Sequence, residues 1–195
     1  MTATTLKAGL FALLLALPAQ GAEAAAEFDL AQLRDGGYIV LLRHVTAGGS
    51  DSDSDDFDLK DCRTQRQVGP SGRAEAAALA ARFEAAGIGE ARVLSSQWCR
   101  ALQTAELLGL GPVTQEPALN YYHWRLGDEQ AMNETLSRYL AGLQAPPPGL
   151  PLVLVSHSTA FTVMGLEAPG AGGGLVLRPN GTAKPDIVGE IAAPE

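Results

Sequence analysis

Three short, largely apolar segments, each followed directly by polar or charged side chains, constrain the fold of this chain more than any other feature. They are residues 38–42, 92–94 and 152–155. Their apolar residues are continuous rather than alternating, which is typical of strands buried on both faces of a parallel sheet. Residues 175–177 and 187–191, separated by the turn Pro179-Asn180-Gly181, are two further strand candidates.

Helical patterns lie between these strands. We predict a helix at residues 71–86, capped by Ser71 and ended at Gly87, and one at about 97–108, capped by Ser96. Further helices are predicted at residues 28–33, 128–143 and 159–166. The alternation predicts an α/β fold with three layers, a mostly parallel central sheet and helices on both faces.

The first residues have the pattern of a secretory signal peptide. Lys7 precedes an apolar run at residues 8–17, and Ala22-Glu23-Ala24 offers a cleavage point. The run is about half of the roughly 20 residues that span a bilayer, so we expect no stable membrane anchor after removal of the signal. We therefore predict a signal peptide at about 1–24, a single domain at 25–195, and a periplasmic or secreted protein.

Composition limits the classes of partner. Hydrophobic residues make up 46% of the chain and charged residues 18%, which permits a packed core. The net charge of −8 argues against a nucleic-acid partner, because such a surface repels phosphate backbones. Cys62 and Cys99 are too few for a structural zinc site and favour one disulfide in an oxidising compartment, although two separate buried thiols remain an alternative.

The polar side chains after the strands define a candidate site, since ligands of parallel sheets bind at the carboxyl ends of the strands. Arg43 and His44 follow the first strand, Arg100 lies soon after the second, and His157 follows the third. Guanidinium groups match phosphate oxygens, and a neutral imidazole is a nucleophile toward phosphorus. Each residue alone also fits a structural role, but together they indicate phosphoryl chemistry that needs no metal.

The motifs around these residues resemble the histidine phosphatase superfamily, which includes phosphoglycerate mutases and acid phosphatases. They are LLRHVT at 41–46, SSQWCRALQTA at 95–105 and VLVSHS at 153–158. The stretch DCRTQR at 61–66, followed by Gly72-Arg73, is similar to a secreted bacterial subgroup. The resemblance extends over about residues 37–181.

The resemblance implies a phosphoglycerate mutase-like fold and assigns roles to residues. His44 would be the phosphorylated nucleophile, and Arg43, Arg100 and His157 would complete the phosphate pocket, with Arg66 as a weaker candidate contact. Cys62 and Cys99 would pair and hold the long loop after the first motif beside the helix that carries Arg100. No cofactor or metal is implied.

The sequence departs from the family pattern at two glycine positions and at the general acid. Val45 and Ser158 stand where glycine is usual, and a β-branched residue does not easily adopt a positive φ. Leu119-Asn120 lacks the expected Leu-x-Glu pattern. Candidate acids are Asp128, Glu129 and His123. The acidic run at 51–58 lacks the Gly and Glu of a calcium loop, and we expect a solvated loop there.

The sequence thus predicts an exported phosphomonoesterase that hydrolyses a small phosphorylated substrate through a phosphohistidine on His44. The alternatives are a catalytically impaired phosphate or sugar-phosphate binding protein of the same fold, or a mutase. A serine hydrolase is disfavoured because the chain has no G-x-S-x-G motif. A zinc enzyme would need His123 to join the other two histidines, without supporting spacing. The identity of the substrate and the oligomeric state stay open.

Overall fold

A six-stranded sheet forms the centre of the protein in the computed structural model, which describes Met1 and residues 27–49 and 52–194. The segment predicted as a signal peptide, 1–24, lies outside the described residues except for Met1. The strands are β1 (Ile39–Arg43), β2 (Arg92–Ser95), β3 (Val113–Gln115), β4 (Leu152–Ser156), β5 (Gly174–Arg178) and β6 (Asp186–Ile191). Their order is β3-β2-β4-β1-β5-β6, with β3, β2, β4 and β1 mutually parallel and β5 and β6 added antiparallel.

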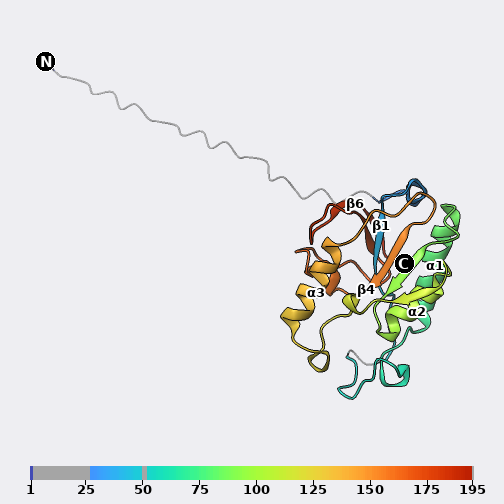
Figure 1. Ribbon diagram of the computed structural model, residues 1–195, viewed down its shortest axis with the longest axis vertical. Coiled ribbons are helices and arrows are strands. Elements are labelled where there is room, and N and C mark those ends of the chain that lie inside the picture. The colour runs from blue at the N-terminus through green and yellow to red at the C-terminus, as the bar shows by residue number, and fades with distance from the viewer. Residues whose placement is uncertain (2–26, 50–51, 195) are drawn as a thin grey trace.

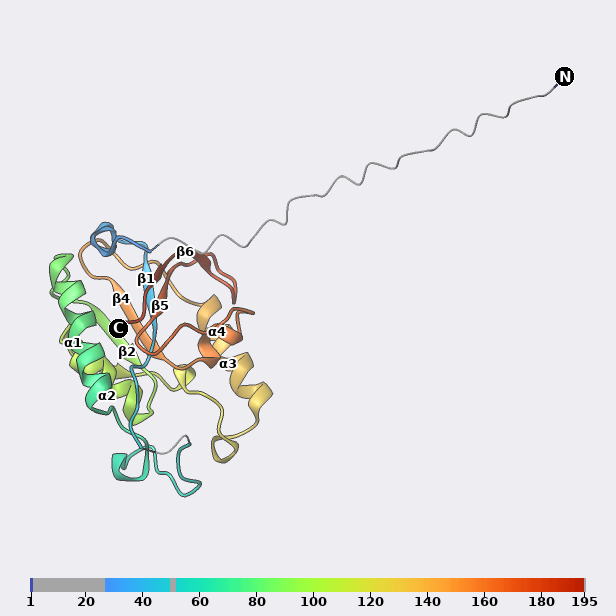
Figure 2. The same ribbon diagram turned by 180° about the vertical axis from the view of Figure 1, so that it is seen from behind.

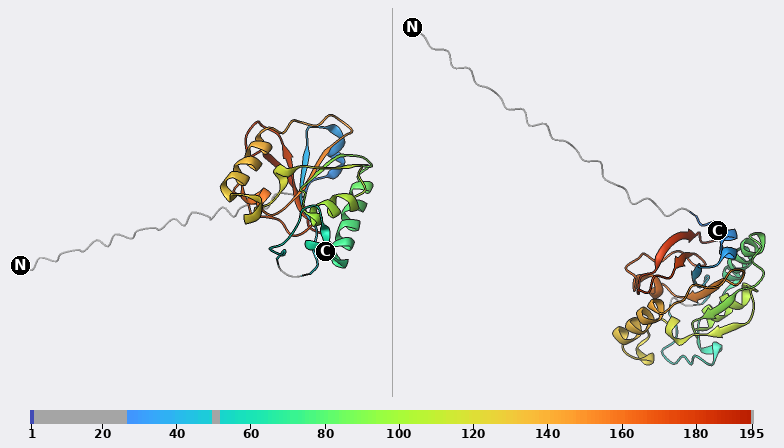
Figure 3. Two further views of the ribbon diagram at one scale, coloured as in Figure 1. Left: turned by 60° about the horizontal axis from the view of Figure 1, so that its bottom comes forward. Right: turned by 45° about the horizontal axis from the view of Figure 1, so that its top comes forward.

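Helices cover both faces of the sheet, as predicted (Figure 1). Helices α1 (Pro70–Ala85) and α2 (Cys99–Leu107) pack on one face, and α3 (Glu129–Ala141) and α4 (Thr159–Thr162) on the other. The view from behind labels α3 and α4 together on the side opposite α1 and α2 (Figure 2), and the left view of Figure 3 shows the same layers. Short 3-10 helices complete the chain: η1 (Leu30–Asp35), η2 (Cys62–Thr64), η3 (Pro117–Leu119) and η4 (Trp124–Leu126).

Burial on both faces explains the continuous apolar runs. Along β1, Val40 and Leu42 belong to the core under α1 and α2, whereas Ile39 and Leu41 belong to the core under α3 and α4. All four side chains are fully buried. Since successive strand residues point to opposite faces, a central strand needs apolar side chains at every position.

Two predicted helix starts are wrong. Helix α1 begins at Pro70 after the N-cap Gly69, rather than after Ser71. Proline suits the first helical position, because its φ is already helical and its missing N–H needs no partner. Helix α2 begins at Cys99 with Trp98 as its N-cap, rather than at Gln97. The hydroxyl of Ser96, the predicted cap, lies instead in a hydrogen-bond network with other side chains.

Several other boundaries also differ from the prediction. The predicted helix at 28–33 is the 3-10 helix η1, and the one at 159–166 is shortened to α4. Helix α3 lies within the predicted 128–143, with Asp128 as its N-cap. Strand β3 was not predicted, because it is three residues long and has no buried residue.

Backbone strain is absent at the two positions where glycine is usual in the family. Among the described residues, positive φ occurs at glycines alone, so neither Val45 nor Ser158 adopts it. Val45 is fully buried and packs with Val68 and Ala76, and Ser158 has helical dihedral angles. In the described part of the chain, no helix has the length and apolar character needed to cross a membrane.

Candidate active site

The register of the parallel strands brings the motif residues to one edge of the sheet. Arg43 in β1 pairs with Ser156 in β4, and Ser95 in β2 pairs with Val155. The ladder continues beyond β1, since the His44 N–H donates to the Ser156 carbonyl at 2.9 Å. The rings of His44 and His157 consequently lie with centroids 5.2 Å apart, edge to face.

The surroundings of His44 fix its tautomer. Its Nδ1 lies 2.7 Å from the Val45 carbonyl oxygen, which only accepts, so Nδ1 carries the proton. Its Nε2 accepts a hydrogen bond of 3.1 Å from the Arg100 Nε–H. Burial, followed by the positive charge of Arg100, lowers the pKa of His44 to about 3. The imidazole is therefore neutral near pH 7, with a lone pair on Nε2.

A buried network orients His157. The Ser96 Oγ lies 2.8 Å from the His157 Nε2 and 2.9 Å from the Asn120 Oδ1. Both contacts are hydrogen bonds only if Ser96 donates to Asn120 and accepts from the His157 Nε2–H. Asn120 Oδ1 is identified as the oxygen because it also accepts from the Gln97 N–H. Burial and the charge of Arg100 lower the pKa of His157 well below its usual value, and its buried Nδ1 has no hydrogen-bond partner among the described residues.

Arg100 connects the nucleophile candidate to a carboxylate that the sequence did not single out. Its NH1 lies 3.0 and 3.2 Å from the two oxygens of Asp53. Both side chains are buried, with 5% and 3% of their surfaces exposed. The Asp53 carboxylate also accepts from the Arg66 backbone N–H at 2.9 Å and from the Tyr121 hydroxyl at 3.1 Å. Burial raises the pKa of Tyr121, which keeps this hydroxyl protonated.

These side chains line an open cavity of about 410 Å³. Its described lining consists of Arg43, His44, Ser52, Asp53, Asp55, Arg66, Arg100, Tyr121, His123, His157 and Ser158. Three arginines give the cavity positive charge within a protein of net charge −8. The NH1 of Arg43 donates to the Pro169 carbonyl at 2.9 Å, and its buried Nε has no hydrogen-bond partner in the described part of the chain. The cavity thus offers charge and unused hydrogen-bonding atoms to an oxyanion.

The predicted site residues divide into two groups. Arg43, His44, Arg100, His157 and Arg66 lie together in the cavity. Of the candidate acids, only His123 lines it. Asp128 instead caps α3 by accepting from the Ala131 N–H, and Glu129 is exposed in the first turn of that helix.

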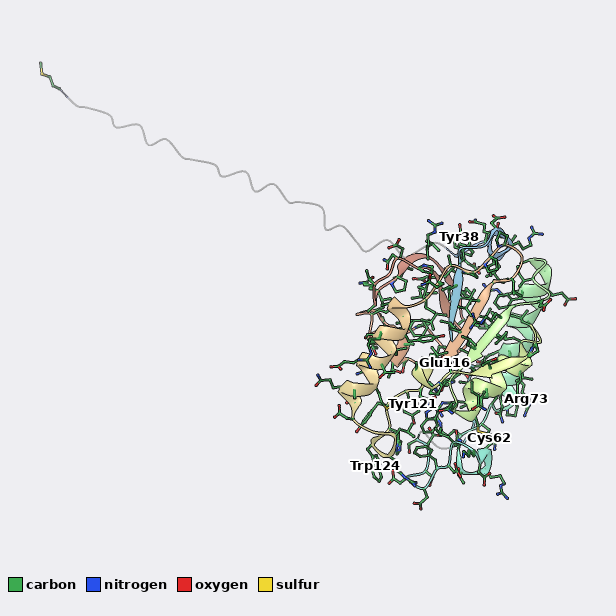
Figure 4. All side chains as sticks on the ribbon, viewed as in Figure 1. Tyr38, Cys62, Arg73, Glu116, Tyr121 and Trp124 are labelled. Atoms are coloured by element: carbon green, nitrogen blue, oxygen red, sulfur yellow. A yellow bond between two sulfur atoms is a disulfide. The ribbon has the colours of Figure 1, made fainter. Side chains whose placement is uncertain are left out.

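The segment 52–68, which we term the pocket loop, is attached to the start of α2. The predicted Cys62–Cys99 disulfide is present, with Cα atoms 5.6 Å apart. Beside it, the Gln65 Oε1 accepts from the Cys99 N–H at 3.0 Å, and the Phe57 ring stacks on Trp98 at 4.5 Å. In Figure 4, Cys62, Tyr121 and Trp124 are labelled below the sheet, on the side where the pocket loop lies.

Sequence reasoning missed Asp53, Tyr121 and Asn120. Asp53 lies within the acidic run that we expected to be solvated, and its neighbours Asp55 and Asp56 are indeed exposed. Its bonds to Arg100 and Tyr121 join residues 47 and 68 positions apart. A single buried aspartate among exposed ones has no periodicity that would distinguish it.

The fold and this pocket define a class of protein. Residues 39–146, more than half of the chain, match the histidine phosphatase superfamily (branch 1). The chain therefore belongs to the histidine phosphatase superfamily, as its motifs indicated.

Solved structures share the fold at low sequence identity. The protein histidine phosphatase SixA complexed with tungstate is 18% identical, with a TM-score of 0.54, over 80% of this chain and 96% of that one. A mycobacterial glucosyl-3-phosphoglycerate phosphatase is 17% identical, with a TM-score of 0.54, over 81% and 100%. A protein described as mycobacterial hydrolase 1 is 17% identical, with a TM-score of 0.56, over 82% and 100%. Among curated protein sequences, none matches this chain.

Proposed function

We propose that this protein is an exported, metal-independent phosphomonoesterase that forms a phosphohistidine on His44. The observation that carries the proposal is the state of His44. Its Nδ1–H is held by the Val45 carbonyl, and the lone pair of Nε2 lies in an arginine-lined cavity. A neutral, oriented imidazole beside fixed positive charge has the properties of a nucleophile for phosphoryl transfer.

Substrate binding rearranges the partners of Arg100. The phosphate group takes the place of the Asp53 carboxylate at NH1, and the Nε–H turns from His44 to a phosphoryl oxygen. A phosphate oxygen is also an acceptor for the buried Arg43 Nε, which no described residue bonds. His157 Nδ1 carries no proton while Nε2–H bonds to Ser96, so its hydrogen bond with a phosphoryl oxygen needs one proton, which the substrate monoanion or water supplies.

The chemistry then proceeds in two displacements. His44 Nε2 attacks phosphorus, the bond to the ester oxygen breaks with its electron pair on that oxygen, and the leaving group takes up a proton. Water next attacks the phosphohistidine, the phosphorus–nitrogen bond breaks, and the pair returns to Nε2. The arginines and His157 stabilise the charge on the equatorial oxygens in both steps.

Two features support export. The pattern of Lys7, the apolar run at 8–17 and Ala22-Glu23-Ala24 is that of a cleaved signal. The Cys62–Cys99 disulfide suits an oxidising compartment such as the periplasm. Mass spectrometry of the protein recovered from the periplasm should show the loss of about 24 residues; an intact N-terminus in the cytoplasm would argue against export.

The central test is hydrolysis of an aryl phosphate by the mature protein with and without EDTA. Activity should survive EDTA and vanish in His44→Ala. The phosphohistidine should be trapped without an acid quench. His123→Ala is the matched control, because it removes another histidine ring from the same cavity and should still allow phosphorylation of His44. Phosphate binding without turnover would favour the impaired binding protein; activity in His44→Ala would exclude this mechanism.

A further inference from the structure

The Asp53 carboxylate is placed to move the proton that the proposed reaction requires. The leaving oxygen of a phosphate ester needs a proton donor within the cavity. Among the described residues that line it, the carboxylates are those of Asp53 and Asp55. Asp53 is buried against Arg100, whereas Asp55 is exposed.

The acids suggested by the sequence are placed less favourably. Asp128 and Glu129 do not line the cavity, and Asp128 is engaged in capping α3. His123 lies at the cavity, but its Nδ1 accepts from the Arg125 N–H and its ring contacts Phe57 and Trp124. Asp53 shares Arg100 with the nucleophile, since that guanidinium contacts the His44 Nε2 and both Asp53 oxygens.

Without substrate, the Asp53 carboxylate accepts hydrogen bonds from three donors among the described residues. The donors are the Arg100 NH1, the Arg66 backbone N–H and the Tyr121 hydroxyl. A phosphate group that binds Arg100 withdraws the strongest donor and brings negative charge next to the carboxylate. A carboxyl group that loses a cationic donor and gains an anionic neighbour takes up a proton more readily, and the substrate monoanion or water supplies it. The Asp53 Oδ1 can keep its hydrogen bond from the Arg66 N–H. The proton is then carried by the Asp53 Oδ2, which contacts Tyr121 and Arg100.

We propose that Asp53 is the proton donor to the leaving group and, after it leaves, the base that activates water. This inference rests on the proposed phosphomonoesterase function. In the first step, the Asp53 proton passes to the ester oxygen as the bond from phosphorus to that oxygen breaks. In the second step, the Asp53 carboxylate accepts a proton from the water that attacks the phosphohistidine, which restores the acid and releases phosphate.

The experiment compares Asp53→Asn with the unaltered protein on two substrates, p-nitrophenyl phosphate and glycerol phosphate. The value of kcat/KM is measured because it reports steps up to the first irreversible one. An alkoxide is a poor leaving group without a proton, so kcat/KM for glycerol phosphate should fall about 10²- to 10⁴-fold. The aryl ester, whose leaving group is stable as an anion, should lose much less. Asp55→Asn is the matched control, removing the same charge from the same loop, and should affect both substrates alike.

The other outcomes overturn the proposal. An equal loss on both esters would make Asp53 a positioning residue, and a gain on both would make its carboxylate only a competitor for Arg100. Inorganic vanadate binding and thermal unfolding of Asp53→Asn establish that the variant is folded and keeps its pocket. Failure of the proposed function has a different signature, because the unaltered protein would then hydrolyse neither ester and form no phosphohistidine.

Discussion

The edge of the sheet and the pocket loop supply the two sides of the same cavity by different physical means. His44 and His157 directly follow central parallel strands, and backbone pairing fixes their separation. Asp53 and Arg66 belong to the pocket loop, which contains no α-helix or strand and is attached through the Cys62–Cys99 disulfide and side-chain contacts. The histidine side of the site is thus built into the sheet, whereas the carboxylate side depends on tertiary contacts.

Arg100 is where the two sides meet. It lies in the first turn of α2, next to Cys99, and contacts both His44 and Asp53. A change in the pocket loop can therefore reach His44 through this guanidinium. The comparison predicts that substitutions at the sheet edge abolish or strongly slow phosphoryl transfer. Substitutions in the pocket loop should weaken phosphate binding and proton transfer.

Among the variants that compare these two regions, His157→Asn should have the largest effect. Loss of the ring that the proposed mechanism places against the phosphoryl group should lower kcat/KM for an aryl phosphate by about 10²- to 10³-fold, the range for removing one stabilising donor. Arg66→Ala, on the loop side, should cost roughly tenfold or less. Steady-state kinetics of both variants test the comparison, and equal losses would contradict it.

Removal of the disulfide should release the loop while leaving the sheet intact. In a Cys62→Ser/Cys99→Ser variant, the free energy of unfolding should fall by about 2–4 kcal/mol, as is typical for a lost disulfide. Affinity for phosphate should fall with it, because Arg66 loses its fixed position at the cavity. Urea unfolding and phosphate titration measure both effects. Reductant should reproduce them in the unaltered protein and change nothing in the variant.

Acid should destabilise the protein through the histidines of the sheet edge. Burial holds the pKa of His44 at about 3, below the ordinary 6.5, so between these pH values the unfolded chain binds a proton that the folded one does not. The free energy of unfolding should fall by about 1.4 kcal/mol per pH unit for this group as pH drops from 6.5 toward 3. The free energy of unfolding of His44→Gln can be measured with urea from about pH 7 to about pH 4. It should depend less steeply on pH than that of the unaltered protein. An unchanged dependence on pH would contradict the lowered pKa of His44.

The smallest effect is expected at Val45, whose side chain packs between the sheet edge and the pocket loop. Val45→Ala should lower the free energy of unfolding by about 1–2 kcal/mol, because two buried methyl groups are lost beside Val68 and Ala76. The side chain does not line the cavity, so KM for an aryl phosphate should change little. A marked fall in KM would show that Val45 restricts access to the pocket.

The sequence predicted the fold well where a local pattern carries the information. Continuous apolar runs identified the central strands, and their alternation with helices identified the layers. Helix starts were less predictable, since Ser71 and Ser96 both have good capping side chains. Pro70 begins α1 one residue earlier, and Ser96 bonds to Asn120 and His157 instead. Strand β3 has no buried residue and therefore no apolar signal.

By itself, the sequence determined the two histidines and two arginines that meet at the sheet edge, because strand ends and motif spacing are local properties of the chain. Only the tertiary structure decided which carboxylate joins them. Asp53 is one of several aspartates in a polar loop, and nothing local distinguishes it from Asp55. Its burial depends on Arg100 and Tyr121, which the chain brings to it only on folding. A buried charge is stable where its partners converge, and that convergence is a property of the fold.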